Sequence, residues 1–353
     1  MNNSNIKLGV SLYSYQDNYY FGRYDLEGCI AAAAGAGATG IEVFPEAMIP
    51  EWPYISDAFV DRWNGMMRRY GVEPVCVDHF SDTRMWKNKN LSDDELYERG
   101  VLYIKTAAKL GAKNIRLMHD EHGGYPMMQA RGNYHLTNVE IATRLLPVAQ
   151  EYGIMMCLEC HAPTHIADPC HEPYLEAAER LGIPNIGLQV DFSSYEYCAG
   201  TADIGMYVRK GANPEILNLI RTRQIEAFRA GVPFEISDIM GEIERLKPNE
   251  IDRLFINTPY AWKKNPASYE DLEKYASKVV YIHGKFCDID ENGEVDNIEY
   301  QKIFDALVRG GYKGYICSEF EGNRRMNDGG WVDEIEYVRK HHVLMRKCLA
   351  NAK

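Results

Sequence analysis

The chain repeats one sequence unit, in which apolar residues at helical spacing are followed by a glycine and then by a short apolar run. Glycine suits that junction because a helix commonly ends with one residue at positive φ. Six clear copies read AAAAGAGATGIEVF, RRYGVEPVCV, AAKLGAKNIRLM, AQEYGIMMCLE, AERLGIPNIGLQVD and VRGGYKGYICSE. The runs IKLGVSLYSY and KVVYIHGKF bring the candidate strands to eight. Such apolar strands favour a parallel sheet covered by helices, and eight units predict a single-domain α/β protein, a (β/α)8 TIM barrel. An open, doubly wound sheet is the alternative architecture.

Four of the predicted strands end in a side chain that can bind a hard divalent cation, namely Glu159, Asp191, His283 and Glu319. A TIM barrel brings the carboxyl ends of its strands to one mouth, where its chemistry takes place. Any one of these carboxylates could instead cap a helix or pair with an arginine, but buried acidic side chains seldom lack a partner. Together the four predict a shared metal site. Three carboxylates and one imidazole suit manganese, magnesium, cobalt or zinc.

Two further side chains follow predicted ligands by two positions, so strand alternation places them on the same face, nearer the mouth. They are His161, after Glu159, and Lys285, after His283. His161 is predicted to be the catalytic base, because an imidazole exchanges a proton near neutral pH and a metal-bound ketone acidifies the adjacent C–H bond. Lys285 is predicted to stabilise an enolate or to bind a substrate hydroxyl. The alternatives are a histidine that only hydrogen-bonds the substrate and a solvated loop lysine.

Other polar and aromatic residues at or near strand ends are predicted to line the substrate pocket. They are Tyr13 on the first strand run, Glu42 on the second, His79 and His119 at the ends of the third and fourth, and Glu321 just beyond Glu319. Aromatic loops such as NYYFGRY and EAMIPEWPY are expected at or near the same mouth. An aromatic-walled pocket of this kind fits a small-molecule glycoside or a sugar.

Three motifs are assigned to structure rather than to chemistry. The glycines of GAGATG (35–40) match a dinucleotide pattern, but here a helix precedes them and a strand follows, the reverse of what phosphate binding needs. Cys157 and Cys160 form a C-x-x-C in a strand-like run, where alternation would direct the two sulfurs to opposite faces. The tandem His341 and His342, on a late helix, are expected at the surface.

The spacing of strand starts, roughly 30 to 40 residues, is broken once, between Asp191 and Val279. We therefore predict an insertion at about residues 195–275, between the sixth and seventh strands, with one helix near 212–230. It would emerge from the sixth βα loop, on the face of the metal site. A lid, a specificity loop and a subunit contact are the possible roles.

Charge and hydropathy exclude several classes of partner. A formal net charge of −12 and a pI near 5.4 argue against nucleic acid, which usually requires a basic surface. No apolar run approaches the roughly 20 residues that span a bilayer, and no secretory leader is evident, so we expect a cytoplasmic protein without membrane contact. Nine scattered cysteines do not suggest a disulfide framework in a chain of 353 residues.

The motifs GIEVF, CLECH, LQVD, YIHGKF and SEFEG give the chain, over almost its whole length, a pattern that resembles the xylose isomerase-like TIM-barrel superfamily of sugar (phosphate) isomerases and epimerases. The resemblance implies that Glu159, Asp191, His283 and Glu319 bind one divalent metal, most often Mn2+ in that family. One departure stands out. Many sugar epimerases carry D-x-x-H after strand six, whereas this chain has Asp191-Phe-Ser-Ser194, which makes two-sided epimerisation doubtful.

The segments GVSLYSY, EAMIPEWPYISDAFVDRW and CVDHFSDTRMW are similar to a narrower group, the α subunits of bacterial C-glycoside deglycosidases. That likeness implies a metal-dependent carbon–carbon lyase that cleaves 3-oxo-C-glucosides of flavonoid type, with His161 removing H2. The products would be the aglycone and an anhydro-hexenulose. It also implies a small β subunit in a hetero-oligomer. A sugar or sugar-phosphate isomerase or epimerase is the main alternative, followed by a DNA-repair endonuclease and by a binding or scaffold role.

Overall fold

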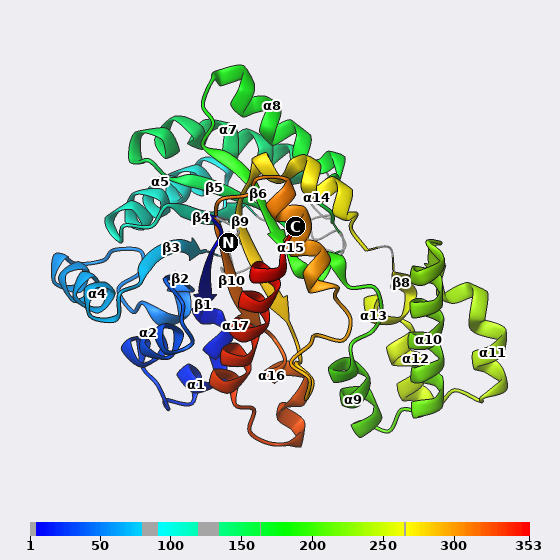
Figure 1. Cartoon of the computed structure of the whole chain (residues 1–353). Coiled ribbons are helices and arrows are strands. Elements are labelled where there is room, and N and C mark those ends of the chain that lie inside the picture. The colour runs from blue at the N-terminus through cyan, green and yellow to red at the C-terminus, as the bar shows by residue number, and fades with distance from the viewer. Residues whose placement is uncertain (1–4, 80–90, 119–133, 163, 265) are drawn as a thin grey trace.

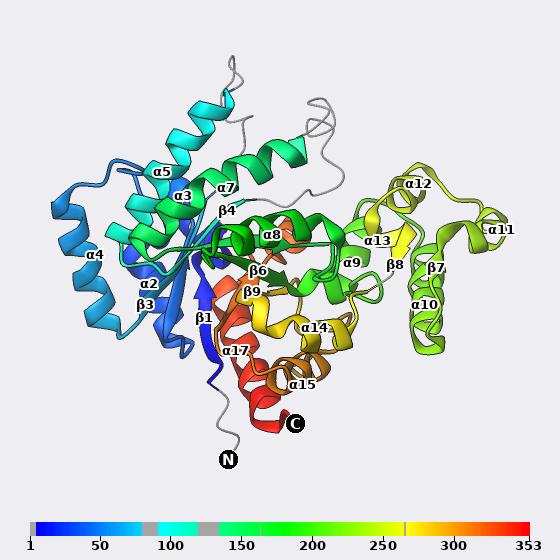
Figure 2. The same cartoon turned by 90° about the horizontal axis from the view of Figure 1, so that it is seen from above.

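The computed structural model describes residues 5–79, 91–118, 134–162, 164–264 and 266–353. Its centre is a barrel of parallel strands, shown in Figures 1 and 2. The strands are β1 (Lys7–Ser11), β2 (Gly40–Val43), β3 (Glu73–Asp78), β4 (Asn114–Met118), β5 (Met155–Cys160), β6 (Ile186–Asp191), β9 (Val279–Phe286) and β10 (Tyr315–Phe320). They close in the order β1-β10-β9-β6-β5-β4-β3-β2. The predicted (β/α)8 TIM barrel is confirmed, and the open sheet is excluded.

Helices cover the outside of the barrel. They are α2 (Leu26–Gly35), α4 (Asp57–Tyr70), α5 (Asp93–Lys109), α7 (Tyr134–Tyr152), α8 (Glu172–Leu181), α14 (Tyr269–Tyr275), α15 (Tyr300–Arg309) and α17 (Glu334–Asn351). Their ends carry the expected signals: Ser92 forms a capping box with Glu95 at the start of α5, and α4 ends at Gly71, whose φ is 65°. The GAGATG segment also ends a helix as predicted, because Gly37 has a φ of 91° between α2 and β2.

Short elements connect the barrel strands to these helices. They are η1 (Leu12–Tyr15), α1 (Gln16–Tyr20), α3 (Pro45–Met48), η3 (Pro169–His171), η4 (Phe192–Tyr195), η6 (Ala276–Lys278), α16 (Asn323–Met326) and η7 (Asn327–Gly329). Five of them, η1, α3, η3, η4 and α16, follow closely on the carboxyl ends of strands. They therefore lie at the mouth of the barrel, where its site is expected.

Strand alternation separates two hydrophobic layers. Cys157 faces the barrel interior, in a small cluster with Cys76, Tyr281 and Cys317. Cys160 belongs to the large core between the strands and the outer helices. The two sulfurs of the C-x-x-C therefore point to opposite sides of the sheet, as predicted, and this motif does not form a metal or redox pair.

The chain between β6 and β9 forms an appendage with a hydrophobic core of its own, to the right in Figures 1 and 2. It contains α9 (Thr201–Arg209), α10 (Pro214–Ala230), η5 (Ile236–Ile239), α11 (Met240–Arg245), α12 (Glu250–Ile256), α13 (Pro259–Trp262) and an antiparallel pair, β7 (Phe234–Glu235) with β8 (Lys263–Lys264). Helix α14, at the end of the predicted range, instead packs on α15 in the outer layer of the barrel. The role of this insertion stays a prediction.

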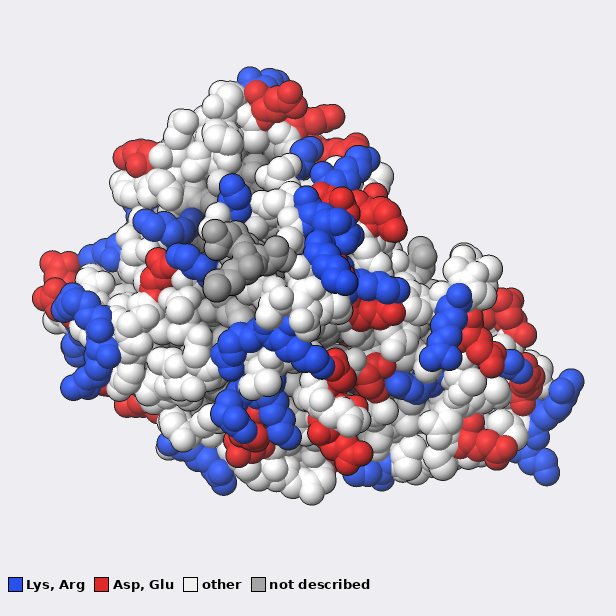
Figure 3. Space-filling model, in the orientation of Figure 1, with Lys and Arg blue, Asp and Glu red and all other residues white. Residues whose placement is uncertain are grey.

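The face shown in Figure 3 carries basic and acidic side chains interspersed, without a continuous basic band. Nucleic-acid-binding surfaces are usually basic patches or stripes, so this face offers no such footprint. No helix in the described part of the chain is long and apolar enough to cross a membrane.

The tandem histidines of α17 are buried, so the expectation of a surface position is wrong. Both have 0% of their surface exposed. His341 Nδ1 lies 2.7 Å from Ser318 Oγ and its Nε2 lies 2.8 Å from the Tyr300 hydroxyl, while His342 Nε2 donates to the Gly9 carbonyl at 3.0 Å. The helical spacing of these histidines with the buried Val338 and Met345 places them on the inner face. They tie α17 to strands β1 and β10 and to helix α15.

We predict that acid destabilises the protein partly through His342. Burial lowers the pKa of His342 to about 4, even though the hydrogen bond to Gly9 opposes this. An unfolded chain binds the proton near pH 6.5, so stability should fall as the pH drops from 6.5 to 4, by up to about 3 kcal/mol for this one group. Urea unfolding at pH 7 and pH 4.5 should show a smaller loss in His342→Gln than in the parent. Equal losses would contradict the prediction.

Candidate functional site

Strand register brings the predicted site residues to one face of the barrel wall. Asp191 on β6 is in register with His283 on β9, and Lys285 is in register with Glu319 on β10. Residues two apart on a strand share a face. His283 and Lys285 therefore both point inward, and so do Glu319 and Glu321, at the carboxyl ends of β9 and β10.

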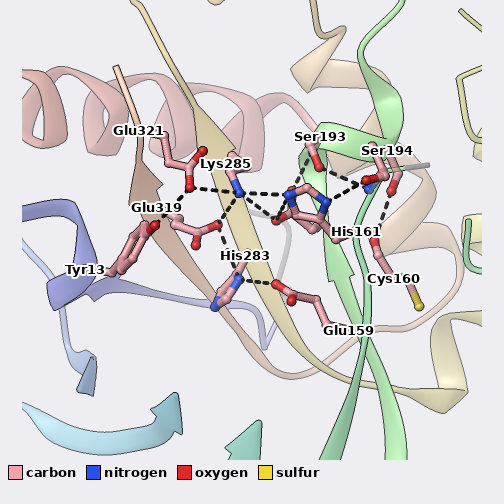
Figure 4. A network of polar contacts seen from close by, with 12 residues as sticks. Tyr13, Glu159, Cys160, His161, Ser193, Ser194, His283, Lys285, Glu319 and Glu321 are labelled. Carbon is pink, nitrogen blue, oxygen red and sulfur yellow. Dashed lines mark hydrogen bonds and ion pairs between the residues drawn. The ribbon is translucent and has the colours of Figure 1, made fainter. Parts of the chain in front are cut away.

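The four predicted metal ligands lie close together, as Figure 4 shows in part. His283 Nδ1 is 3.1 Å from Glu159 Oε1 and 3.3 Å from Glu319 Oε2. Donor atoms of Glu159, Asp191 and His283 lie within 4.8 Å of one another. Each of the four residues is at most 5% exposed, so the cluster is shielded from solvent.

This cluster fits a divalent cation on two grounds. The first is an orphaned atom, since the buried Glu319 Oε2 receives no hydrogen bond from the described residues, although His283 and Lys285 lie within 3.5 Å. Burial also raises the pKa of Glu319 to about 8, despite the opposing influence of His283 and Lys285. The carboxylate is thus short of positive charge in the protein alone.

The second ground is the charge balance inside the barrel. Among the described residues, five carboxylates are buried there, against two permanently basic side chains, Arg116 and Lys285. The carboxylates belong to Glu42, Asp78, Glu159, Asp191 and Glu319. Buried carboxylates require partners, and a dication offsets two charges at once. Oxygen-rich sites with one imidazole are common for such ions.

A layer of polar groups supports the ligands from below. Both carboxylate oxygens of Glu42 lie 3.0 Å from His283 Nε2, on the side of the ring away from Glu159. Glu42 is fully buried behind the ring of His283, where it can orient the ring, and its substrate-binding role stays a prediction. Arg116 on β4 donates to Asp78 and, at 2.5 Å, to Glu159 Oε2. Burial raises the pKa of Asp78 to about 7, while Arg116 opposes this.

Arg116, Asp78 and Gln189 were missed by the sequence reasoning. Each is a charged or amide residue inside an otherwise apolar strand run, and that contrast is the signal that would have identified them. Gln189 is fully buried, and its Nε2 lies 3.2 Å from a ring nitrogen of His283. The polar layer below the ligands is therefore larger than predicted.

His161 presents one ring nitrogen to the site. Its Nδ1 lies 2.8 Å from the Ala162 carbonyl, which can only accept, so Nδ1 carries the hydrogen of the neutral ring. Nε2 is then the nitrogen that carries the lone pair; it accepts a hydrogen bond from Lys285 Nζ at 3.1 Å and lies 4.0 Å from Asp191 Oδ2. This is the tautomer that a base needs.

Lys285 lies among carboxylates. Figure 4 shows it between His161 on one side and Glu319 and Glu321 on the other. Its Nζ is 3.4 Å from Asp191, 3.5 Å from Glu319 and 3.4 Å from Glu321. Burial lowers the pKa of Lys285, but the surrounding carboxylates outweigh this and raise it well above the ordinary value. Lys285 is therefore an ammonium ion held at the site, not a solvated loop lysine.

Tyr13 and Glu321 are brought to the rim of the cluster. The Tyr13 hydroxyl donates to Glu321 Oε1 at 3.2 Å, and Arg324 on α16 donates to that hydroxyl and, at 3.1 Å, to Gln16. Burial would raise the pKa of Glu321, but Lys285 and Arg324 lower it to about 2. The rim thus combines a phenol, a carboxylate and a guanidinium, which can bind sugar hydroxyls.

One predicted pocket residue, His79, makes its contacts away from this cluster. His79, at the end of β3, forms an ion pair with Glu46 and packs on Tyr103, with ring centroids 3.7 Å apart, and on Trp52. These partners hold its ring at the wall of the barrel, between α3 and α5. His119 lies outside the described residues. The substrate-binding role of each stays a prediction.

The model of the family described as xylose isomerase-like TIM barrel matches residues 30–341. The chain belongs to this family. The predicted superfamily is thus confirmed, and the closed barrel agrees with it.

Relatives that align with almost the whole chain are named as deglycosidase alpha subunits. The chain is 29% identical to the C-glycoside deglycosidase alpha subunit of Arthrobacter globiformis, over 99% of this chain and 94% of that one. It is 27% identical to the 3'-dehydrocarminate deglycosidase alpha subunit of a Microbacterium species, over 97% of this chain and 94% of that one. The predicted resemblance to this group is confirmed, as is the prediction that the chain is an enzyme.

Solved structures of low identity share the fold. A D-tagatose 3-epimerase-like protein has a TM-score of 0.54 at 15% identity, covering 98% of each chain. The D-allulose 3-epimerase of a Methylomonas species, in complex with D-allulose, has a TM-score of 0.55 at 13% identity, covering 97% of this chain and 96% of that one. The IOLI protein, solved with a zinc atom, has a TM-score of 0.55 at 12% identity, covering 98% and 99%. This last protein binds metal on the same fold.

We predict that Glu159→Gln weakens metal binding, because the amide keeps the shape of the side chain but removes its charge from the cluster. The expected loss of Mn2+ affinity is on the order of 100-fold. Titration of free Mn2+, followed by its electron paramagnetic resonance signal, measures it. Glu151→Gln, an exposed glutamate of α7, is the matched control and should bind as the parent does. Equal affinities in the two variants would refute the assignment.

Proposed function

We propose that this enzyme is a metal-dependent lyase that cleaves the C-glycosidic bond of 3-oxo-C-glucosides of flavonoid type. The observation that carries the proposal is the placement of His161 Nε2, the ring nitrogen without a hydrogen, within hydrogen-bond distance of Lys285 and next to the cluster of Glu159, Asp191, His283 and Glu319. The near full-length similarity to deglycosidase alpha subunits supports the choice of substrate. We propose Mn2+ as the cation, with Mg2+, Co2+ and Zn2+ as alternatives.

When bound, the divalent cation supplies Lewis acidity, which polarises a ketone and makes the neighbouring C–H bond more acidic. Within this arrangement, His161 Nε2 accepts the proton from C2 of the sugar, since its other nitrogen is already committed to Ala162. The electron pair of that C–H bond forms an enolate with the 3-oxo group. Lys285 holds positive charge beside it.

The enolate then collapses with loss of the aglycone from C1. The ketone at C3 is restored, a double bond forms between C1 and C2, and the sugar leaves as an anhydro-hexenulose. The aromatic carbon of the aglycone takes up a proton, from an acid or through its phenol tautomer. Atoms and charge balance without water or an oxidant.

Elimination needs only one base, and this chain has a serine at the position where many sugar epimerases have a second histidine. Ser194 stands where many epimerases have the histidine of D-x-x-H, and its hydroxyl lies 2.9 Å from the carbonyls of Cys160 and Thr164. It therefore ties η4 to the loop after β5 and offers the sugar no base. This favours elimination over the return of a proton to the opposite face.

A small β subunit is proposed as partner, because the full-length relatives are named alpha subunits. A hetero-oligomer would then be the active form. The insertion between β6 and β9 is one candidate contact, since its core is separate from that of the barrel. Affinity purification from the native cell should recover a small subunit in fixed ratio, and its absence at full activity would overturn this part of the proposal.

The proposed reaction is tested by mass spectrometry of the products formed from a 3-oxo-C-glucosyl flavonoid, with the Mn2+-loaded protein alone and with its partner. Free flavonoid and an anhydro-hexenulose are expected. The matching glucoside without the 3-oxo group is the control and should remain intact, because its H2 is not acidic. Absence of release, together with exchange of the α-hydrogen of a ketose in deuterated water, would instead identify an isomerase or epimerase.

We predict that His161→Asn binds Mn2+ as tightly as the parent but loses turnover by roughly 10²–10⁴-fold, the usual contribution of a general base. Metal titration and the release assay, applied to the same sample, separate the two properties. If the variant retains turnover, another group must remove the proton.

A further inference from the structure

We infer that Arg116 limits Glu159 to a single metal bond, and that it thereby keeps one coordination position open for the substrate. Arg116 lies in the polar layer below the candidate ligands, with its side chain 6% exposed. This inference rests on the proposed function only in assuming that a cation binds to the cluster. It concerns a positioning residue, one that acts through a ligand.

The two oxygens of Glu159 have different surroundings. Oε2 accepts from Arg116 Nη1 at 2.5 Å, whereas Oε1 faces His283 Nδ1 at 3.1 Å. A carboxylate can bind a cation through one oxygen or through both. Since Oε2 is engaged by the guanidinium, Oε1 is the atom left to face the cation.

The guanidinium cannot easily release that oxygen. Arg116 Nε donates to Asp78 Oδ1 at the same time, so one rigid fork joins two carboxylates of neighbouring strands. All three side chains are buried, and a buried guanidinium that loses an acceptor pays a desolvation penalty. The Arg116–Glu159 bond is therefore expected to persist when a cation binds.

In two other candidate ligands, too, one atom is held by a neighbouring group and another faces the centre of the cluster. His283 turns Nε2 to Glu42 and Nδ1 to the cluster. Asp191 Oδ1 accepts from the Ser193 backbone at 2.6 Å, while its Oδ2 lies toward Lys285. Three of the four ligands thus have one atom fixed from behind and one directed to the centre. For an ion that favours octahedral coordination, about two positions would stay free if Glu319 also bound through one oxygen, enough for a ketone and an adjacent hydroxyl.

The test counts water molecules on the bound ion rather than turnover. Water-proton relaxation of the Mn2+-saturated protein depends on the number of exchanging waters that the ion carries. In Arg116→Met, Oε2 is freed and Glu159 can bind through both oxygens, so the relaxation enhancement per bound Mn2+ should fall to roughly half, as one of about two waters is displaced. Asp78→Asn is the matched control, because it keeps an acceptor for Nε and leaves the Arg116–Glu159 bond in place.

A fall in Arg116→Met but not in Asp78→Asn supports the inference. An unchanged enhancement in Arg116→Met overturns it, and so does an equal fall in both variants, which would point to the packing of the whole layer. If Arg116→Met does not fold, Arg116→Lys is judged by the same criteria, since an ammonium keeps the charge but loses the fork. Failure of the parent protein to bind Mn2+ would overturn the metal proposal itself, and this outcome is distinct from the other two.

Discussion

The site is governed by the cost of burying several carboxylates inside one barrel. Burying an unpaired carboxylate costs more solvation free energy than the small net free energy that stabilises a folded domain. The barrel meets this demand at two levels. Arg116 neutralises charge below the ligands, and Lys285 does so at the mouth. In the space between them, Glu319 has an oxygen that receives no hydrogen bond from the described residues, and this is where a bound dication would offset the remaining charge.

The same polar contacts also orient the side chains of the candidate metal ligands. A carboxylate or imidazole with one atom held from behind has few rotamers left, so its other atom is aimed before any cation arrives. His161 is held differently, because its Nδ1 contacts the backbone carbonyl of Ala162 and not a buried carboxylate. The proposed base is thus held next to the acidic cluster, with its proton-accepting nitrogen turned toward Lys285. Such a separation suits a reaction in which the metal activates the substrate and one side chain removes a proton.

The segment after β10 joins the site to the insertion. Two adjacent arginines of α16 point to opposite sides: Arg324 contacts Tyr13 at the rim, while Arg325 pairs with Asp203 and with the Tyr260 hydroxyl of the insertion. The ion pair between Arg325 and Asp203 is 2.5 Å long, and both side chains are largely buried. The insertion is therefore fastened to the element that carries part of the substrate rim, although its core is separate.

The sequence by itself determined the barrel and the side chains that share its inner face. The helix, glycine and apolar-run unit is local, and the two-residue period of a strand places Glu159 and His161 on one side without knowledge of the partner strand. Only the tertiary structure decided that Arg116 reaches Glu159 and that His79 turns to Glu46. These contacts join elements far apart in the chain, and they depend on the register and closure of the barrel, which no local pattern encodes.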